Sequence, residues 1–289
     1  MKALAALLLL SLMILGPTTG RAEDKRIVLI AGKPSHPHGE HEFRAGLLLF
    51  QKCLAGIPGI QVEVYSNGWP ANSDVLKGAA AIVIYSDGGP AHPALQDDHL
   101  QQLGALMKQG VGLACIHYAV EPTIEKGERE LIDWIGGCYE INWSVTPVWE
   151  ADFKTLPEHP ITRGVKPFKL DDEWYFHMRF RDGADTILAA VPPLSTVSRP
   201  DGPHDNNPTV RALVQRGNVA QIVAWATARA DGGRGFGFTG GHYHRNWGND
   251  NVRKLVLNGI LWVAKVEVPP DGVASTVTAA ELEENLDHK

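Results

Sequence analysis

Cysteine is scarce in this sequence, and several familiar catalytic patterns are missing from it. Only Cys53, Cys115 and Cys138 occur, with no C-x-x-C pair, so a disulfide framework is excluded and a single bridge among them stays undetermined. No basic block accompanies the formal net charge of −6, which argues against nucleic acid as a partner. Neither H-E-x-x-H nor G-x-S-x-G occurs, which excludes the zinc-protease helix and the hydrolase nucleophile elbow.

The first 22 residues predict a secretory signal peptide. Lys2 gives a positive start, and residues 3–15 form an apolar run too short to span a bilayer comfortably. Gly20 and Ala22 place small residues at the positions that a signal peptidase reads, and no cysteine is near for a lipid anchor. Cleavage near Ala22 removes Lys2 and Arg21, which leaves a charge of −6 − 2 = −8. We therefore expect an exported protein, periplasmic or extracellular, without a stable membrane anchor.

The sequence after the predicted signal peptide indicates one α/β domain over residues 23–268, followed by a tail over residues 269–289. The full sequence has 44% hydrophobic and 21% charged residues, which is ordinary for a globular protein. Apolar runs that predict buried strands alternate with segments of helical periodicity. The strands are expected at 26–31, 61–65, 80–85 and 111–116, and the helices at 42–54 and 95–109. This alternation predicts a doubly wound, mostly parallel sheet flanked by helices.

The second half of the chain is less regular. Residues 143–149 are compatible with a strand, and residues 186–191 predict another. Residues 220–225 and 235–239 predict a hairpin, because Asp, Gly and Arg residues separate them at 231–234. A closing helix is expected at 251–264, and a short charged helical piece at 279–286.

Histidines follow several of the predicted strands. His117 ends the buried run GVGLACI, His36, His38 and His41 follow the first strand, and His242 and His244 follow the last. Ligands of doubly wound folds bind outside the carboxyl ends of the strands, so we expect these imidazoles to share one site. Plain hydrogen bonding in loops is the better interpretation of the other histidines, which are His92, His99, His159, His204 and His288.

The segment DDEWYFH, residues 171–177, sets acids beside aromatic side chains. Strand-like alternation would send Glu173, Tyr175 and His177 to one face, whereas Asp171 and Asp172 are expected in a solvated turn. Imidazoles together with carboxylates such as Glu173 and Glu121 suit Zn²⁺ or a similar divalent ion. Aromatic residues near these clusters can stack on sugar rings, and those considered are Trp143, Trp174, Trp247 and Tyr243, while Trp225 and Trp262 are expected in the core.

The order of these segments resembles the ThuA-like (trehalose-utilisation) family, which has the class I glutamine amidotransferase-like fold. The resemblance covers about the whole chain between the predicted signal peptide and the tail. Its motifs are GLACIHYAVE at 112–121, HPITRGV at 159–165, DEWYFH at 172–177, GFGFTGGHYHRNW at 235–247, and HPHGEHEF at 36–43, which resembles large exported members. In the amidotransferases a cysteine occupies the elbow where His117 stands here, and His242 resembles their later histidine. The resemblance therefore implies sugar utilisation and argues against glutaminase chemistry.

These observations support one leading hypothesis, an exported enzyme that acts on a small-molecule carbohydrate, a disaccharide or keto-sugar, as a metal-assisted hydrolase, lyase or isomerase. His117, Glu173 and His242 are the expected metal ligands or acid–base groups. The residues expected around substrate are His36, His38, His41, Tyr118, Glu121, Trp143, Tyr175, His177, Tyr243 and His244. A non-catalytic carbohydrate-binding module and a hydrolase that uses Cys115 are the alternatives. The sequence does not indicate an oligomeric state.

Overall fold

The structure is a computed structural model that describes residues 24–289, so the predicted signal peptide lies outside the described residues. The strands are β1 (Lys25–Ala31), β2 (Ile60–Tyr65), β3 (Ala81–Tyr85), β4 (Gly112–Ile116), β5 (Gly137–Cys138), β6 (Val148–Phe153), β7 (Phe168–Glu173), β8 (Arg179–Phe180), β9 (Asp185–Ala190), β10 (Gln221–Ala228) and β11 (Arg234–Phe238). The α-helices are α1 (Phe43–Leu54), α2 (His99–Met107), α3 (Glu128–Ile135), α4 (Pro208–Gln215), α5 (Asp250–Val263) and α6 (Ala279–Leu282).

A seven-stranded sheet in the order β2-β1-β3-β4-β11-β10-β9 forms the centre of the fold. The pairs from β2 to β11 are parallel, and β10 pairs antiparallel with both β11 and β9. The predicted hairpin is therefore confirmed, and β10 alone runs against the other strands of this sheet. The mostly parallel α/β class predicted from the sequence is also confirmed.

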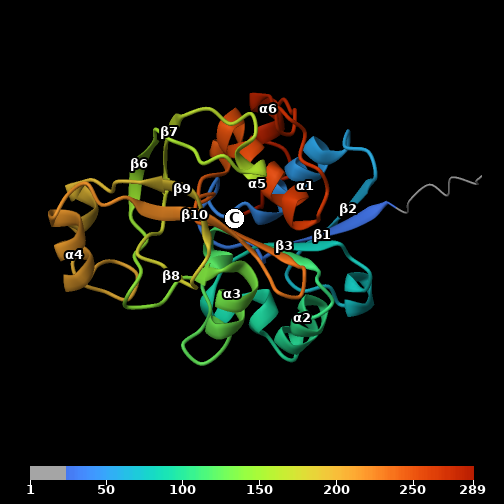
Figure 1. The fold of residues 1–289 in the computed structure, drawn as a ribbon, viewed down its shortest axis with the longest axis horizontal. Coiled ribbons are helices and arrows are strands. Elements are labelled where there is room, and N and C mark those ends of the chain that lie inside the picture. The colour runs from blue at the N-terminus through green and yellow to red at the C-terminus, as the bar shows by residue number, and fades with distance from the viewer. Residues whose placement is uncertain (1–23) are drawn as a thin grey trace, which may run out of the picture.

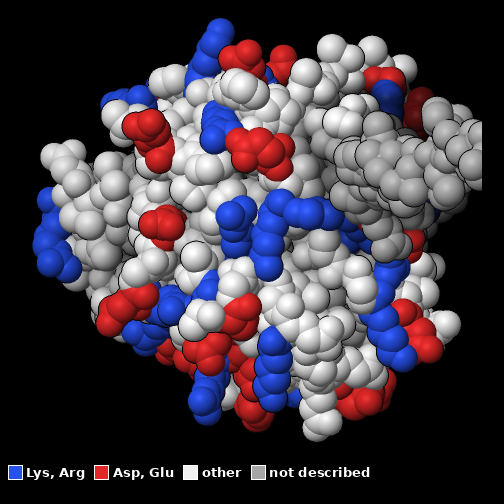
Figure 2. Space-filling view, turned by 45° about the vertical axis from the view of Figure 1, so that its right-hand side comes forward, with Lys and Arg blue, Asp and Glu red and all other residues white. Residues whose placement is uncertain are grey.

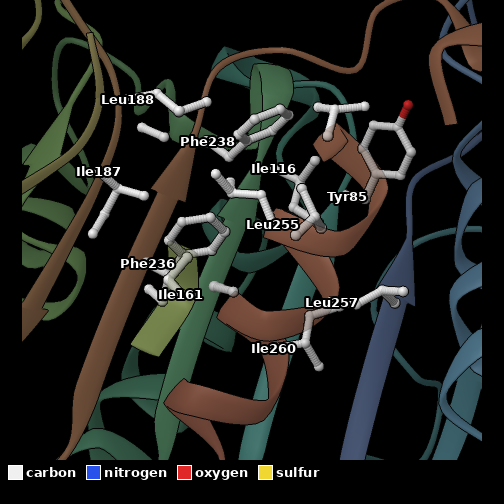
Figure 3. Close-up of a cluster of buried hydrophobic side chains, with 14 of the residues drawn as sticks. Tyr85, Ile116, Ile161, Ile187, Leu188, Phe236, Phe238, Leu255, Leu257 and Ile260 are labelled. Atoms are coloured by element: carbon white, nitrogen blue, oxygen red, sulfur yellow. The ribbon is translucent and has the colours of Figure 1, made fainter. Parts of the chain in front are cut away.

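The two faces of the sheet bury two separate hydrophobic cores. Alternation along β1 sends Ile27 and Leu29 into the core that packs on α1 and α5, and Val28 and Ile30 into the core that packs on α2 and α3. The two pairs of helices lie on opposite sides of the sheet (Figure 1). Figure 3 shows the first core, where Phe236 and other sheet residues meet side chains of α5. Each large apolar side chain buried in this way contributes roughly 1.5–3 kcal/mol.

Close packing of α5 on the sheet requires a residue without a side chain at position 112. A Cβ atom placed on Gly112 would lie 2.1 Å from the carbonyl oxygen of Val263 at the end of α5. The glycine therefore lets the last turn of α5 rest directly on β4. This contact helps to position β4 against α5, and the carboxyl end of β4 carries His117.

Two small antiparallel sheets of two strands each lie beside the main sheet. Strand β6 pairs antiparallel with β7, and β5 pairs with β8. The strand considered at residues 143–149 is wrong in position, since residues 141–144 form turns and β6 begins at Val148. The alternation of buried Trp149, Ala151 and Phe153 with more exposed neighbours explains why the strand forms there instead.

The segment after α5 returns over α1. Its short helix α6 is capped by Thr278, which accepts a hydrogen bond from the backbone N–H of Glu281. Lys289 then places its Nζ atom 3.3 Å from Glu42 Oε1 and donates to the carbonyl of Glu40 at 2.6 Å. These contacts bring the end of the described chain beside the loop that carries His41.

The outer surface mixes both signs of charge. On the face in Figure 2, basic and acidic side chains are interspersed. Among residues 24–289, no helix combines the length and the apolar composition that crossing a bilayer requires.

Candidate metal centre

Three loops at the carboxyl edge of the sheet bring three histidines together. His41 follows β1, His117 follows β4, and His242 follows β11, and these strands lie close together in the sheet order. Nε2 of His41 lies 3.0 Å from Nε2 of His117 and 3.0 Å from Nδ1 of His242. Glu173, at the end of β7, completes the group, with Oε2 3.6 Å from His117 Nε2 and 3.3 Å from His242 Nδ1. The predicted meeting of His117, Glu173 and His242 is observed, and His41 joins them.

His117 occupies a strained elbow between β4 and the short 3₁₀ helix His117–Val120. Its φ is 57°, in the left-handed region that non-glycine residues seldom adopt. Such strain persists only where the surroundings enforce it, and it concentrates at functional sites. The backbone turns so sharply here that the imidazole points out over the strand end, where the three other groups meet it.

The outer nitrogens of the three histidines determine which atoms face inward. Nδ1 of His117 donates to the carbonyl of Thr239 at 2.8 Å, because a carbonyl can only accept. Nδ1 of His41 lies 2.8 Å from Oδ1 of Asp87, and Nε2 of His242 lies 3.4 Å from Oε2 of Glu40. Carbonyl and carboxylate partners of this kind fix the tautomer of metal-binding histidines. The inward nitrogens of His41 and His117 then present lone pairs, and Nδ1 of His242 does so once it gives up the proton that it shares with Glu173.

Three imidazole nitrogens and a carboxylate therefore converge, and few donors serve them. The Tyr175 hydroxyl lies 3.2 Å from His117 Nε2 and can satisfy one of these acceptors. The remaining acceptors call for a proton or a metal cation between them. Four atoms bound at about 2.0–2.2 Å to one tetrahedral ion lie roughly 3.3–3.6 Å apart. The distances of 3.0, 3.3 and 3.6 Å observed here come close to that spacing, and all four ligand atoms lie within 4.8 Å of one another.

The electrostatics of the group favour a bound cation. Burial and the neighbouring His36 and His242 lower the pKa of His41 to about 2, and burial together with His41 holds the pKa of His117 well below its usual value. Burial acts against charge on His242 as well, but Glu173 outweighs it and raises the pKa of His242. Glu173 is likewise buried, yet His242 and His117 lower its pKa. Two neutral imidazoles and a carboxylate paired with a third imidazole form a set that could hold a divalent ion, and binding would then release the proton shared by Glu173 and His242.

Asp172 holds the turn that carries His242, which corrects the prediction of a solvated acid. Its side chain is fully buried. Its carboxylate accepts hydrogen bonds from the backbone N–H of Gly241 at 2.8 Å and of His242 at 3.1 Å. Burial raises the pKa of Asp172, although these bonds oppose the shift. Gly241 has a φ of +106°, which other residues rarely adopt, so the turn depends on glycine there as well. Asp171 is exposed, as predicted.

The prediction that Glu173, Tyr175 and His177 share one face is wrong for His177. Strand β7 ends at Glu173, so alternation does not continue to position 177. Glu173 and Tyr175 reach the histidine group, whereas His177 stacks on Trp143 with ring centroids 4.2 Å apart and bonds to the Trp143 carbonyl. Arg179 also lies over the Trp143 ring, 3.6 Å from its centroid. The Trp143 indole is thus engaged by protein side chains.

The remaining histidines of the first loop differ in their contacts. His36 stacks on His41 with ring centroids 3.5 Å apart and lies 3.7 Å from Asp87, so it covers the outer side of the group. With His41 and Asp87 it forms a second set of possible ligands. His38 is exposed, and no hydrogen bond or ion pair of its side chain occurs within residues 24–289.

His244, which follows β11, is 2% exposed, and neither ring nitrogen has a partner among the described residues.

Aromatic side chains surround the centre. Tyr118 packs edge-on against His41, with ring centroids 6.2 Å apart, and Tyr243 packs edge-on against His242 at 4.6 Å. Trp174 and Trp247, which were considered as stacking residues, are fully buried, as are the predicted core residue Trp225 and nearly all of Trp262. The tyrosines, not these tryptophans, lie in contact with the histidines of the group.

Glu121 pairs with a histidine that the sequence did not assign to the site. The buried Glu121 carboxylate accepts from Nε2 of His204 at 2.9 and 3.1 Å. His204 packs edge-on against Tyr118, one ring away from His41. No local pattern in the sequence links this pair, because 83 positions separate its members. The interpretation of the other loop histidines is confirmed for His92, His99 and His159, which bond to nearby backbone groups.

Cys115 is excluded as an exposed nucleophile. Its side chain is completely buried within β4, and burial raises the pKa of its thiol. Buried thiols of this kind are inert. None of the three cysteines is in a disulfide, Cys138 is buried as well, and Cys53 is half-buried.

The sheet order and the parallel strands from β2 to β11 define a glutamine amidotransferase-like α/β fold. The sequence profile of the ThuA family, described as trehalose utilisation, matches residues 28–263, and the chain belongs to this family. No curated protein matches the chain.

Two solved structures share this fold. A ThuA-like protein from Bacteroides uniformis ATCC 8492 is similar with a TM-score of 0.58 and 14% identity, over 86% of this chain and 95% of that one. A ThuA-like protein from Parabacteroides merdae ATCC 43184 is similar with a TM-score of 0.55 and 14% identity, over 89% of this chain and 94% of that one. At this identity the likeness extends to the fold alone.

Proposed function

We propose that this protein is an exported enzyme of carbohydrate utilisation, acting on a disaccharide or keto-sugar, and that it holds a divalent metal ion at His41, His117, Glu173 and His242. The convergence of three imidazole lone pairs and one carboxylate carries the proposal. The carbohydrate class rests on the family description of trehalose utilisation. When bound, the ion would polarise a sugar carbonyl or activate water.

The protein groups around the centre have distinct roles in this proposal. His41 and His117 are buried, neutral and fixed by Asp87 and Thr239, so they serve as ligands. Glu173 has a side chain that is 20% exposed, which lets its carboxylate both bind the ion and exchange a proton with substrate. Tyr118 and Tyr243 supply apolar ring surface at the approach.

Metal content tests the centre directly. Untagged protein is dialysed against a mixture of Zn²⁺, Mn²⁺, Co²⁺ and Ni²⁺, and the bound metal is measured by elemental analysis. We expect one ion per chain in the wild type, a strong loss in His41→Ala and His117→Ala, and no loss in His38→Ala, which changes an exposed histidine of the same loop. A wild-type protein without stoichiometric metal contradicts the metal centre.

Turnover tests the enzymatic part. Wild type and Glu173→Gln are incubated with trehalose, sucrose and their keto derivatives, and products are followed by mass spectrometry. Product with the wild type, and a loss of at least about 100-fold with Glu173→Gln, are expected from removal of an acid–base group. Export is tested separately by sequencing the N-terminus of secreted protein, which we expect to begin near position 23.

The coordination number favours one alternative, a carbohydrate-binding module without catalysis. Four protein ligands complete a tetrahedral ion such as Zn²⁺, and closed sites of this kind are structural, whereas ions that accept six ligands keep positions free for substrate. Sugar binding without turnover, by protein loaded with tetrahedral Zn²⁺, would support this alternative.

A further inference from the structure

A second cavity lies at the same edge of the sheet as the histidine group and shares a wall with it. It has a volume of about 420 Å³, within the range of small-molecule sites. Loops after three adjacent strands line it: Lys33 follows β1, Asn67 and Trp69 follow β2, and Asp87 follows β3. We call this space the Trp69 cavity. None of its lining residues is among the four proposed metal ligands.

Asp87 connects the cavity to the metal centre. Its Oδ1 atom accepts from Nδ1 of His41 at 2.8 Å, and the same residue lines the cavity. A molecule that fills the cavity therefore lies one side chain away from the histidine group.

Trp69 is held rigidly in the cavity wall. Its indole stacks on His99, with ring centroids 4.8 Å apart and an angle of 11° between the rings. Its Nε1–H group lies 3.3 Å from Ser73 Oγ and 3.3 Å from Gln102 Oε1. An aromatic ring fixed in this way offers a pre-formed surface for the apolar face of a ligand at little cost in conformational entropy.

The rim of the cavity is also built by backbone hydrogen bonds. Gly68 donates its N–H to the carbonyl of Ala31, and Gly32 donates to the carbonyl of Tyr85. These bonds join the loops after β2, β1 and β3 to one another. The cavity is therefore part of the folded scaffold and does not depend on a loop closing over it.

The polar groups of the cavity fit hydroxyl groups better than anions. The lining carries one ammonium, Lys33, and two carboxylates, Asp87 and Asp97, which disfavours phosphate or another polyanion. The side chains of Lys33, Asn67 and Asp97 form no hydrogen bond or ion pair within residues 24–289, so their donors and acceptors are free for a ligand. One flat aromatic surface surrounded by amide, carboxylate and ammonium groups is the arrangement that recognises a sugar ring.

We infer that the Trp69 cavity is a sugar-binding subsite, which holds the ring of an uncharged saccharide that is not at the metal. The inference rests on the proposed carbohydrate function, and it adds the place where a second ring binds. It does not depend on the metal, because the lining residues bind sugar through stacking and hydrogen bonds alone.

Binding of defined sugars tests the subsite without any activity measurement. Trehalose, maltose, sucrose and glucose are titrated into wild type, Trp69→Ala, Trp69→Phe and Trp134→Ala by calorimetry and ligand-observed NMR. Trp134 is a half-buried tryptophan on α3, outside the cavity, and serves as the matched control. For the sugar that binds best, we expect Trp69→Ala to weaken binding about 10-fold or more through loss of the stacking surface, and Trp69→Phe and Trp134→Ala to stay within about threefold of wild type.

Fluorescence supplies a second readout. We expect sugar to change the tryptophan emission of wild type and Trp134→Ala, and to leave that of Trp69→Phe unchanged although this variant still binds. Unaltered affinity of Trp69→Ala, or no binding of any sugar in the panel to wild type, overturns the subsite.

Repeating the titrations with chelator-treated protein separates the two proposals. Loss of binding in Trp69→Ala, in a protein that never holds metal, would keep the subsite and reject the metal centre. One bound ion per chain, together with a Trp69→Ala variant that binds sugar normally, would reject the subsite and keep the metal centre.

Discussion

The Nε2 atoms of His41 and His117 lie 3.0 Å apart, although 76 positions separate the two residues in the chain. Both outer nitrogens donate, to Asp87 and to the Thr239 carbonyl, so two lone pairs face each other in a buried place. Facing lone pairs repel, and positive charge between them makes the arrangement favourable. An ion bound at this group, as proposed, would therefore couple the folding of this edge of the sheet to metal binding.

The first prediction concerns stability. Removing metal with a chelator should lower the melting temperature, and adding the preferred ion at about 100 times its Kd should restore about 2.7 kcal/mol. Differential scanning calorimetry of the two forms measures the effect. His38→Ala should respond like wild type, and His117→Ala should not respond. Equal melting temperatures for chelated and metal-loaded wild type would contradict the prediction.

Asp172 gives a second prediction. Asp172→Ala removes the acceptor from the backbone N–H groups of Gly241 and His242 in a buried turn, which should cost roughly 2 kcal/mol or more of unfolding free energy. Urea unfolding followed by circular dichroism measures this cost. The neighbouring exposed Asp171, changed to Ala, is the control and should alter stability little. Similar losses for the two variants would show that the turn does not depend on Asp172.

His92 predicts a pH dependence that is independent of the metal. Its pKa is lowered by burial to about 4, while Nε2 donates to the Ala119 carbonyl and Nδ1 accepts from the Ala94 N–H. The unfolded chain binds a proton near pH 6.5, so this stability is complete above that pH and is lost as the pH falls toward 4.

At pH 5 the loss from His92 alone is about 2 kcal/mol. Unfolding free energies of wild type and His92→Asn at pH 7.5 and 5 measure it, since asparagine keeps an acceptor for Ala94 but does not titrate. The wild type should lose about 2 kcal/mol more than the variant over this interval. His288→Asn, at an exposed position, should follow the wild type. Parallel curves for wild type and His92→Asn would refute the assignment.

The Glu121–His204 pair predicts a change in a single imidazole. The hydrogen bond to Glu121 raises the pKa of His204, with burial opposing and the charges of Glu121 and Asp205 adding to the rise. Glu121→Gln should lower that pKa, and Asp205→Asn should lower it less. NMR titration of the His204 ring protons reports both values. An unchanged pKa in Glu121→Gln would mean that the pair does not persist in solution.

Thiol labelling makes the last prediction. Cys115 and Cys138 are fully buried, and burial raises the pKa of each thiol, whereas Cys53 is half-buried. Native protein should therefore react with a thiol reagent only at Cys53, slowly, and denatured protein at every cysteine. Cys53→Ser should abolish the native reaction. Rapid labelling of Cys115 in that variant would contradict the prediction and support the alternative hypothesis of a hydrolase that uses Cys115.

Much of the scaffold follows from the sequence because its signals are local. The buried strands around Leu29 and Leu113 are continuous apolar runs, and parallel strands direct their following loops to one edge. His117 and His242 could be placed at that edge for this reason. Their contact with Glu173 depends in addition on where β7 ends, which only the structure shows.

The errors arise where tertiary contacts override local pattern. An aspartate is usually exposed, and nothing near Asp172 in the sequence indicates burial. Its burial is favourable only because it accepts hydrogen bonds from the backbone N–H groups of a turn 69 positions away. Alternation placed His177 with Glu173 because the end of β7 is not visible in the sequence. His204 is a hydrogen-bonding loop residue, as predicted, but its partner Glu121 could not be named because it belongs to a different part of the chain.

The contacts of Lys289 have a practical consequence for purification. Its ammonium group bonds to Glu40 and Glu42, the two residues that flank His41. A polyhistidine tag added after this lysine would place extra imidazoles within reach of the centre, where they could capture an ion or occupy the ligand positions themselves. Metal stoichiometry is best measured on protein purified through an affinity handle that is cleaved off or that contains no histidine.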